Sequence, residues 1–147
     1  MLKKTAIFIV ITLILIQFIS VDNTNPEIDD KLTLKAPQEV MQLLEKSCYD
    51  CHSYETRWPD YSKIAPISFF VASHVTSARK AVNFSKWEDI DPKIKQKRLK
   101  RAIKTVNNGM MALPSYILAH EEARLTKDEK VILTDWFKKE LTSISKI

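Results

Sequence analysis

The spacing of apolar residues predicts that the chain folds as a set of short amphipathic helices. In several separate stretches an apolar residue recurs every three or four positions, which places these residues on one face of a helix. The stretches lie at residues 37–48, 66–82, 92–108 and 126–141, and a shorter one follows Pro114. The pattern therefore predicts an all-α domain.

Residues that favour helix ends stand at the borders of these stretches. Pro37 and Pro66 lie where the first two helices are expected to begin, and Asp91-Pro92 supplies an N-cap followed by proline at the first helical position. Thr126 to Glu129 has the sequence of a capping box at the start of the last helix. The single glycine, Gly109, is placed to end the third helix.

The first residues of the chain differ in composition from the rest. Lys3 and Lys4 precede a run at residues 5–21 that is apolar on every side, which is typical of an export signal. No pair of small residues marks a cleavage site at the end of the run. We therefore expect residues 5–21 to anchor the protein on the periplasmic side of the inner membrane. The alternative is secretion into the periplasm after the leader is cleaved.

Three segments follow from this division. Residues 1–21 are expected to be a signal anchor or signal peptide, and residues 22–36 a polar linker with little fixed structure. Residues 37–147 are expected to be the folded domain. The chain of 147 residues, of which 45% are hydrophobic, is long enough for one domain of ordinary size.

The only two cysteines lie in the segment Cys48-Tyr49-Asp50-Cys51-His52. The pattern C-x-x-C-H is typical of c-type haem attachment, in which two thiols bond the vinyl groups of haem and the next imidazole binds its iron. It predicts one covalent haem c, with His52 as the proximal ligand. The same residues also fit a thioredoxin-type dithiol, half of a zinc site completed by other histidines, or a short disulfide. The helical context and the scattered histidines favour haem.

Candidates for the wall of a haem pocket follow the motif. Trp58 and Tyr61 lie in an irregular loop after His52, where aromatic rings either cap the core or cover the haem. Arg57, in the same loop, is a candidate partner for a haem propionate. Tyr116, in the shorter helical stretch, is a further candidate for the pocket.

A sixth iron ligand is expected after the glycine. Met111 lies on a loop two residues after Gly109, where a thioether can approach iron from the side opposite His52. Packing in the core is the plainer role for this methionine and its neighbour. Met110 and His74 are the alternative ligands, although a histidine on an apolar helical stripe is more often a packed residue.

The chain is mildly basic, with a formal charge of +5. Basic residues cover the outward side of the third predicted helix: Lys93, Lys95, Lys97, Arg98, Lys100, Arg101 and Lys104. Nucleic acid would suit such a run in the cytoplasm, but the expected export excludes this partner. A solvated face, or steering towards acidic redox partners or anionic lipid headgroups, is expected instead.

Several short motifs resemble those of a known family. They are Cys48-Tyr49-Asp50-Cys51-His52-Ser53, Thr56-Arg57-Trp58-Pro59, Tyr61-Ser62-Lys63-Ile64-Ala65-Pro66, Asn83-Phe84-Ser85-Lys86-Trp87 and Met111-x-Leu113-Pro114-x-Tyr116. Together they make residues 35–141 similar to the bacterial haem-binding domain family of small exported c-type haem proteins.

The resemblance implies that Cys48 and Cys51 hold haem covalently, that His52 is the proximal ligand and that the methionine after the glycine is the distal one. In the family pattern a glycine, one variable residue and the methionine are followed by proline. Met111 fits this pattern, and Ala112 takes the place of the proline.

The favoured hypothesis is a cytochrome c-like helical domain that transfers single electrons between redox partner proteins, with no catalytic residue. A haem-based gas sensor or peroxidase-like enzyme is the alternative. It requires a displaceable sixth ligand and a polar distal residue, for which His74, His120 or Arg57 would serve. A haem-bearing accessory domain that anchors or assembles a larger complex is a third hypothesis.

Overall fold

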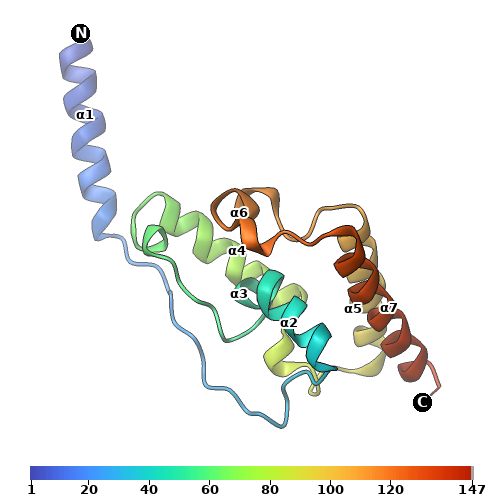
Figure 1. The fold of residues 1–147 in the computed structure, drawn as a ribbon. Coiled ribbons are helices and arrows are strands. Elements are labelled where there is room, and N and C mark those ends of the chain that lie inside the picture. The colour runs from blue at the N-terminus through green and yellow to red at the C-terminus, as the bar shows by residue number, and fades with distance from the viewer. Residues whose placement is uncertain (147) are drawn as a thin grey trace.

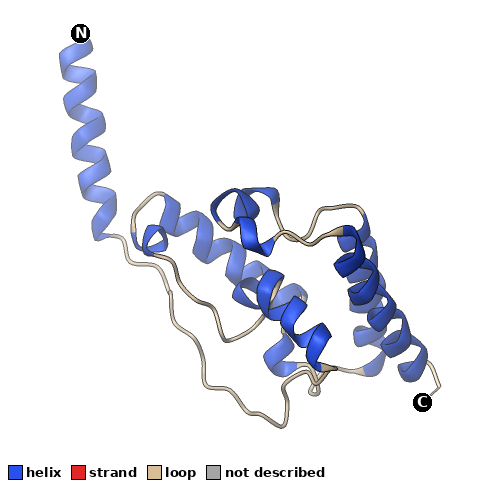
Figure 2. Ribbon diagram, viewed as in Figure 1, coloured by secondary structure: helices blue, strands red, loops and turns tan. Residues whose placement is uncertain are grey.

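The computed structural model describes residues 1–146, and every regular element among them is helical (Figure 2). The helices are α1 (Leu2–Leu15), α2 (Gln38–Ser47), α3 (Tyr49–His52), α4 (Ile67–Ala81), α5 (Pro92–Asn107), α6 (Pro114–Ala119) and α7 (Lys127–Ile144). Single 3₁₀ turns lie at Ile16–Phe18, Asp60–Lys63, Phe84–Lys86 and Glu121–Ala123. The predicted all-α class is confirmed.

Helices α5 and α7 lie side by side, and α2 packs against α7 (Figure 1). The short helix α3 joins this group to α4, against which it packs. One apolar core runs through the assembly: Leu34, Val40, Leu43, Leu44, Tyr49, Phe84, Trp87, Leu99, Val106, Leu125, Leu133, Trp136 and Phe137. Helix α1 projects away from the domain (Figure 1).

The predicted caps form as expected. The Asp91 carboxylate accepts hydrogen bonds from the backbone N–H groups of the second and third residues of α5, after Pro92 at its first position. Both reciprocal bonds of the capping box at Thr126 and Glu129 are present. Gly109 has φ +68°, the left-handed conformation that a helix end requires and glycine adopts without strain.

The segment at residues 22–36 has no helix, but it is fixed to the domain, contrary to the expected loose linker. Leu34 is only 2% exposed, and its N–H donates to the Phe84 carbonyl at 2.8 Å. The Glu88 N–H in turn donates to the Leu32 carbonyl at 2.9 Å. Isolated leucines in a polar stretch give no periodic signal, so the sequence did not show this docking.

The residues just after α1 also contact the domain. The Gln17 side-chain amide donates to the Ala65 carbonyl and accepts from the Ala65 N–H, both at 3.0 Å. No side chain of α1 itself is buried. In residues 1–146 no helix has both the length and the apolar character that crossing a membrane requires.

One residue of the expected basic face is buried. Lys95 is 9% exposed, its ammonium lies 2.7 Å from a Glu88 carboxylate oxygen, and it also lies over the Trp87 ring. The solvated role expected for Lys95 is therefore wrong. The charge is tolerated inside because a carboxylate and an aromatic face compensate it.

The contact between α2 and α7 predicts a pH-dependent contribution to stability. Glu129 holds the Lys46 ammonium with one oxygen and the Thr126 N–H with the other. The hydrogen bond from Lys46 is the main cause that lowers the pKa of Glu129, so the charged form stabilises the fold. This stabilisation is present above the ordinary carboxyl pKa and is lost as pH falls through the lowered value.

We therefore expect Glu129→Gln to lower the free energy of unfolding by about 0.5–1 kcal/mol at neutral pH. The difference from wild type should begin to shrink as pH falls below the ordinary glutamate pKa of about 4.3, and it should disappear as pH falls through the lowered pKa of Glu129 in the folded protein. Urea unfolding at several pH values measures it, with Glu27→Gln as an exposed control. A difference that stays constant on acidification would contradict the assignment.

Candidate functional site

The motif from Cys48 to His52 lies at a break between two helices. Helix α2 ends at Ser47, Cys48 has non-helical φ −129° and ψ −37°, and α3 begins at Tyr49. The sequence predicted that the first helix would present the motif at its C-terminal end; the motif does follow α2 directly, although the helix ends one residue earlier than expected. The Ser47 hydroxyl donates to the Ala123 carbonyl at 2.8 Å, and the buried Tyr49 ring stacks on Phe84. These contacts fix both sides of the break.

The His52 ring is oriented by the end of α4. Its Nδ1 lies 3.1 Å from the Ala78 carbonyl oxygen and 3.0 Å from that of Val82. Carbonyl oxygens only accept, so Nδ1 carries the proton and the lone pair of Nε2 is free. Burial lowers the pKa of His52, which favours the neutral ring. The residue therefore offers a neutral imidazole nitrogen of fixed orientation, as a metal ligand requires.

His52 lines a cavity of about 460 Å³ together with Cys48 and Met111. It is the larger of the two cavities that border the Cys48–His52 motif, and it lies between the end of α4, α5 and α7. Its apolar wall comes from Ala81, Val82, Phe84, Trp87, Ile94, Leu99, Ala102, Val106 and Phe137. A space of this size whose wall is mostly apolar fits a large apolar cofactor.

A second cavity, of about 240 Å³, lies on the Cys51 side of α3. Three of the predicted pocket residues, Arg57, Tyr61 and Tyr116, line this smaller cavity with His74. The two cysteines therefore face different cavities, and a macrocycle bonded to both would border on both.

Trp58, the fourth predicted pocket residue, lines neither cavity. Its ring lies under the Arg79 guanidinium, 5.9 Å from the ring centroid, and its buried indole N–H has no partner among the described residues. The structure therefore places Trp58 beside Arg79, away from the cavity that His52 faces.

Asp50, between the two cysteines, connects the motif to the loop and helix that follow. Its oxygens accept from Arg57 Nε and Nη2, both at 3.0 Å, and from the Tyr116 hydroxyl at 2.5 Å. Burial alone would raise the pKa of Asp50, but the hydrogen bonds from Arg57 and Tyr116 outweigh it and lower the pKa. The sequence did not single out Asp50. The guanidinium suggested for a propionate thus already has a carboxylate partner.

The other histidines contact the smaller cavity or its border. Tyr61 Oη lies 2.8 Å from His120 Nε2, and the Tyr116 ring stacks on the same imidazole at 4.5 Å. His74 Nδ1 donates to the Phe70 carbonyl at 2.9 Å. Neither histidine lines the larger cavity.

The two methionines occupy different surroundings. Met111 lines the larger cavity and packs against the core, whereas Met110 is 48% exposed and lines neither cavity. The backbone N–H groups of both donate to the Thr105 carbonyl, at 3.3 and 2.9 Å. These bonds and the turn at Gly109 hold the loop against α5, with Met111 inward.

Both thiols are protonated at neutral pH. Burial raises the pKa of Cys48 to about 12 and that of Cys51 to about 11. A thioredoxin-type pair needs a lowered thiol pKa, so this environment argues against the dithiol alternative. Within residues 1–146 no three side chains of His, Cys, Asp or Glu are grouped to hold a metal ion.

Cations at the larger cavity are a feature that the sequence analysis missed. Lys97, Arg98 and Arg101 of α5 line it together with Lys80 of α4. The three residues of α5 were expected to belong to a solvated face; Lys97 and Arg101 are exposed as expected, and Arg98 is half-buried. The signal was present, because positions 94, 98, 101, 102 and 105 share one side of a helix at three- and four-residue spacing.

A family model matches most of the chain. The sequence model described as haem-binding domain matches residues 11–139, most of the chain, and the match begins inside the apolar N-terminal run. No curated protein and no solved structure matches the chain. The free Nε2 of His52, the adjacent cysteines and the large apolar cavity fit a haem.

The bonds at Asp50 predict that Tyr116 stabilises the domain. We expect Tyr116→Phe to lower the free energy of unfolding by about 1–2 kcal/mol, because it removes a hydrogen bond to a largely buried carboxylate. Denaturant unfolding measures the change. Tyr54→Phe is the matched control, since the Tyr54 hydroxyl makes no hydrogen bond with a described residue. Equal effects of the two substitutions would refute this role of Tyr116.

Proposed function

Since the chain belongs to the haem-binding domain family and is a haem-binding protein, we propose that it carries one covalent haem c and transfers single electrons. Cys48 and Cys51 form the thioether bonds, His52 is the proximal iron ligand and Met111 is the distal ligand. The observation that carries the proposal is the shared cavity. His52, with its Nδ1 proton fixed, faces the same apolar space as Cys48 and Met111.

His52 is suited to the proximal role by its hydrogen bonds. Two carbonyl acceptors at Nδ1 hold the ring in one orientation and make Nε2 a stronger donor to a metal. The end of α4 provides both acceptors, so the orientation depends on backbone and not on a mobile side chain. Little rearrangement of the ring is then needed when the metal changes its charge.

Met111 and the cavity wall favour the reduced state of the cofactor. When bound, haem iron supplies a centre that accepts and releases one electron. A thioether ligand stabilises ferrous over ferric iron, and an apolar wall disfavours the extra positive charge of the ferric state. The protein therefore stabilises one oxidation state without any proton transfer or substrate chemistry.

The sensor or peroxidase-like alternative is less consistent with the geometry. It needs a polar residue beside an open iron position, and Arg57, His74 and His120 were the candidates. Arg57 pairs with Asp50, and His74 faces the smaller cavity. His120 is hydrogen-bonded to Tyr61. The cavity shared by His52 and Met111 has none of the three in its wall.

We place this activity on the periplasmic side of the inner membrane, with exported redox proteins as partners and without nucleic acid. Support comes from the basic start of the chain and from α1, whose apolar side chains are exposed and contact no core. Residues 5–21 hold the protein at the membrane in the favoured form. Cleavage of the leader would release the same domain into the periplasm.

Measurement of the intact mass of natively matured protein tests two points together: whether haem is covalently attached and whether the leader is retained. We expect the mass of a chain that retains residues 1–21 plus one haem, and a pyridine haemochrome spectrum that remains with the denatured protein. Cys48→Ser should leave at most one thioether bond. A colourless protein, or haem that acid solvent extracts, would contradict covalent attachment, and a mass that starts near residue 22 would replace the anchor with a cleaved signal.

Substitution of the two methionines tests the distal ligand. We expect Met111→Ala to open the sixth position, so that the ferrous protein binds carbon monoxide readily. The midpoint potential should fall by roughly 100 mV or more, a fraction of the ~0.8 V range that axial ligands span. Met110→Ala is the matched control and should change neither property. Unchanged spectra and potential in Met111→Ala would assign the ligand elsewhere.

A further inference from the structure

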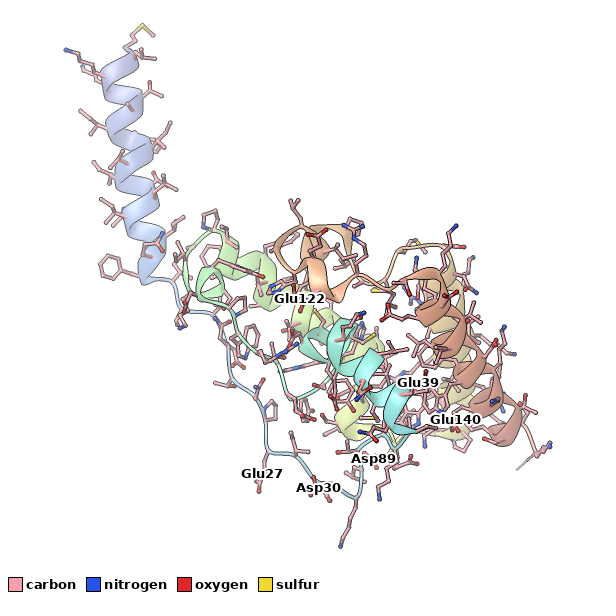
Figure 3. The ribbon with its side chains drawn as sticks, viewed as in Figure 1. Glu27, Asp30, Glu39, Asp89, Glu122 and Glu140 are labelled. Carbon is pink, nitrogen blue, oxygen red and sulfur yellow. The ribbon has the colours of Figure 1, made fainter. Side chains whose placement is uncertain are left out.

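The larger cavity has cations in its wall and no carboxylate. Lys80, Lys97, Arg98 and Arg101 line it, whereas no aspartate or glutamate does. None of the carboxylates labelled in Figure 3, such as Glu39, is among the residues that line this cavity. The cavity therefore combines an apolar interior with an edge of positive charge. Lys80 and Arg98 also line a neighbouring cavity of about 520 Å³ together with Asp22 and Asp89, whereas Lys97 and Arg101 do not.

These four cations differ from Lys95 and Arg57, the basic residues near the site that have a carboxylate partner. Within residues 1–146 none of the four forms an ion pair, whereas Lys95 on the same helix pairs with Glu88. The Arg57 guanidinium donates two hydrogen bonds to Asp50. The Arg98 side chain makes one hydrogen bond, in which its Nη2 donates to the Lys80 carbonyl at 3.3 Å. This bond connects α5 to the end of α4.

We propose that Arg98 and Arg101, assisted by Lys80 and Lys97, bind the two propionate carboxylates of the haem at the edge of the larger cavity. This inference rests on the proposed function, because the haem must lie in the cavity that Cys48 and His52 line. It replaces Arg57, which the sequence offered as a candidate for this role.

The chemistry of haem matches this division of the cavity. The macrocycle is apolar and carries two carboxylates, and a carboxylate that leaves water without a partner is costly. An arginine presents paired N–H donors that match the two oxygens of a carboxylate, so two arginines one helical turn apart suit two such groups. The lysines add charge without fixed geometry.

The proposal has an electrostatic consequence at the iron. Positive charge beside the propionates offsets their negative charge, which would otherwise stabilise the ferric state. The other titratable groups that line the cavity are Cys48 and His52; the wall residues from α7, the Phe84–Trp87 turn and the Met111 loop carry no charge. The potential should therefore respond to these cations more than to basic residues on the outer side of α5.

The test compares cavity-lining and outer cations of one helix in the matured holoprotein. We expect Arg98→Gln and Arg101→Gln each to lower the midpoint potential, with the ferrous-to-ferric ratio at a fixed poise falling roughly three- to tenfold. The potential of both variants should also become more dependent on pH around neutrality, as less strongly held propionates titrate. Lys100→Gln and Lys104→Gln, exposed and outside the cavity wall, should change neither property.

Charge-conserving variants keep the test decisive if a glutamine variant matures poorly. Arg98→Lys and Arg101→Lys should retain most of the potential, because the charge remains. Potentials and pH profiles that are equal in all variants would overturn the proposal. If the arginine variants kept their potential and were only reduced more slowly by an acidic partner protein, the cations would bind that partner and not the propionates. The proposal would then also fail. A protein that never acquires haem would instead refute the proposed function itself.

Discussion

The two hydrogen bonds from His52 Nδ1 to the carbonyls of Ala78 and Val82 are the constraint on which the site depends. They leave Nε2 as the only ring nitrogen with a lone pair that can bind a metal, and they join α3 to the end of α4. Carbonyls in the last turn of a helix have no partner within it, and Val82 is the residue that caps α4. The same bonds therefore satisfy part of a helix end and orient the imidazole.

Positive charge near the site is divided between two separate tasks. On the Cys51 side, Arg57 neutralises Asp50, and this pair with Tyr116 joins the cysteine motif to α6. On the Cys48 side, the cations of α4 and α5 have no carboxylate in the cavity wall. The first group stabilises the protein itself, whereas the second remains available to an anionic ligand. Sequence position alone does not distinguish them, because Arg57 is nearer to the motif along the chain.

The sequence predicted the elements whose signals are local. Helix starts at Asp91 and Thr126 and the end at Gly109 depend on side chains or conformations within a few residues, and all three are observed. The break at Cys48 has no such signal, since neither glycine nor proline lies there. It arises from contacts with distant residues, including Ala123 and Phe84.

Of the site, the sequence predicted the cysteine motif with its histidine and the methionine on the loop after Gly109. Helical spacing puts Arg98 and Arg101 on one side of α5, but that this side borders a cavity follows only from the packing of α5 against α7. The same holds for Lys95, which a helical wheel places outside and Glu88 holds inside. Long basic side chains are ambiguous in sequence, because their stems pack while their charges reach water or a partner.

The docking of Leu32 and Leu34 has a consequence for how the domain tolerates processing. A cut at the end of the apolar run would remove Gln17 and its bonds to Ala65, yet the extended segment that completes the core would stay on the shorter chain. The longer and the shorter chain would thus share one intact interior, and processing would change where the domain is held without changing how it is built.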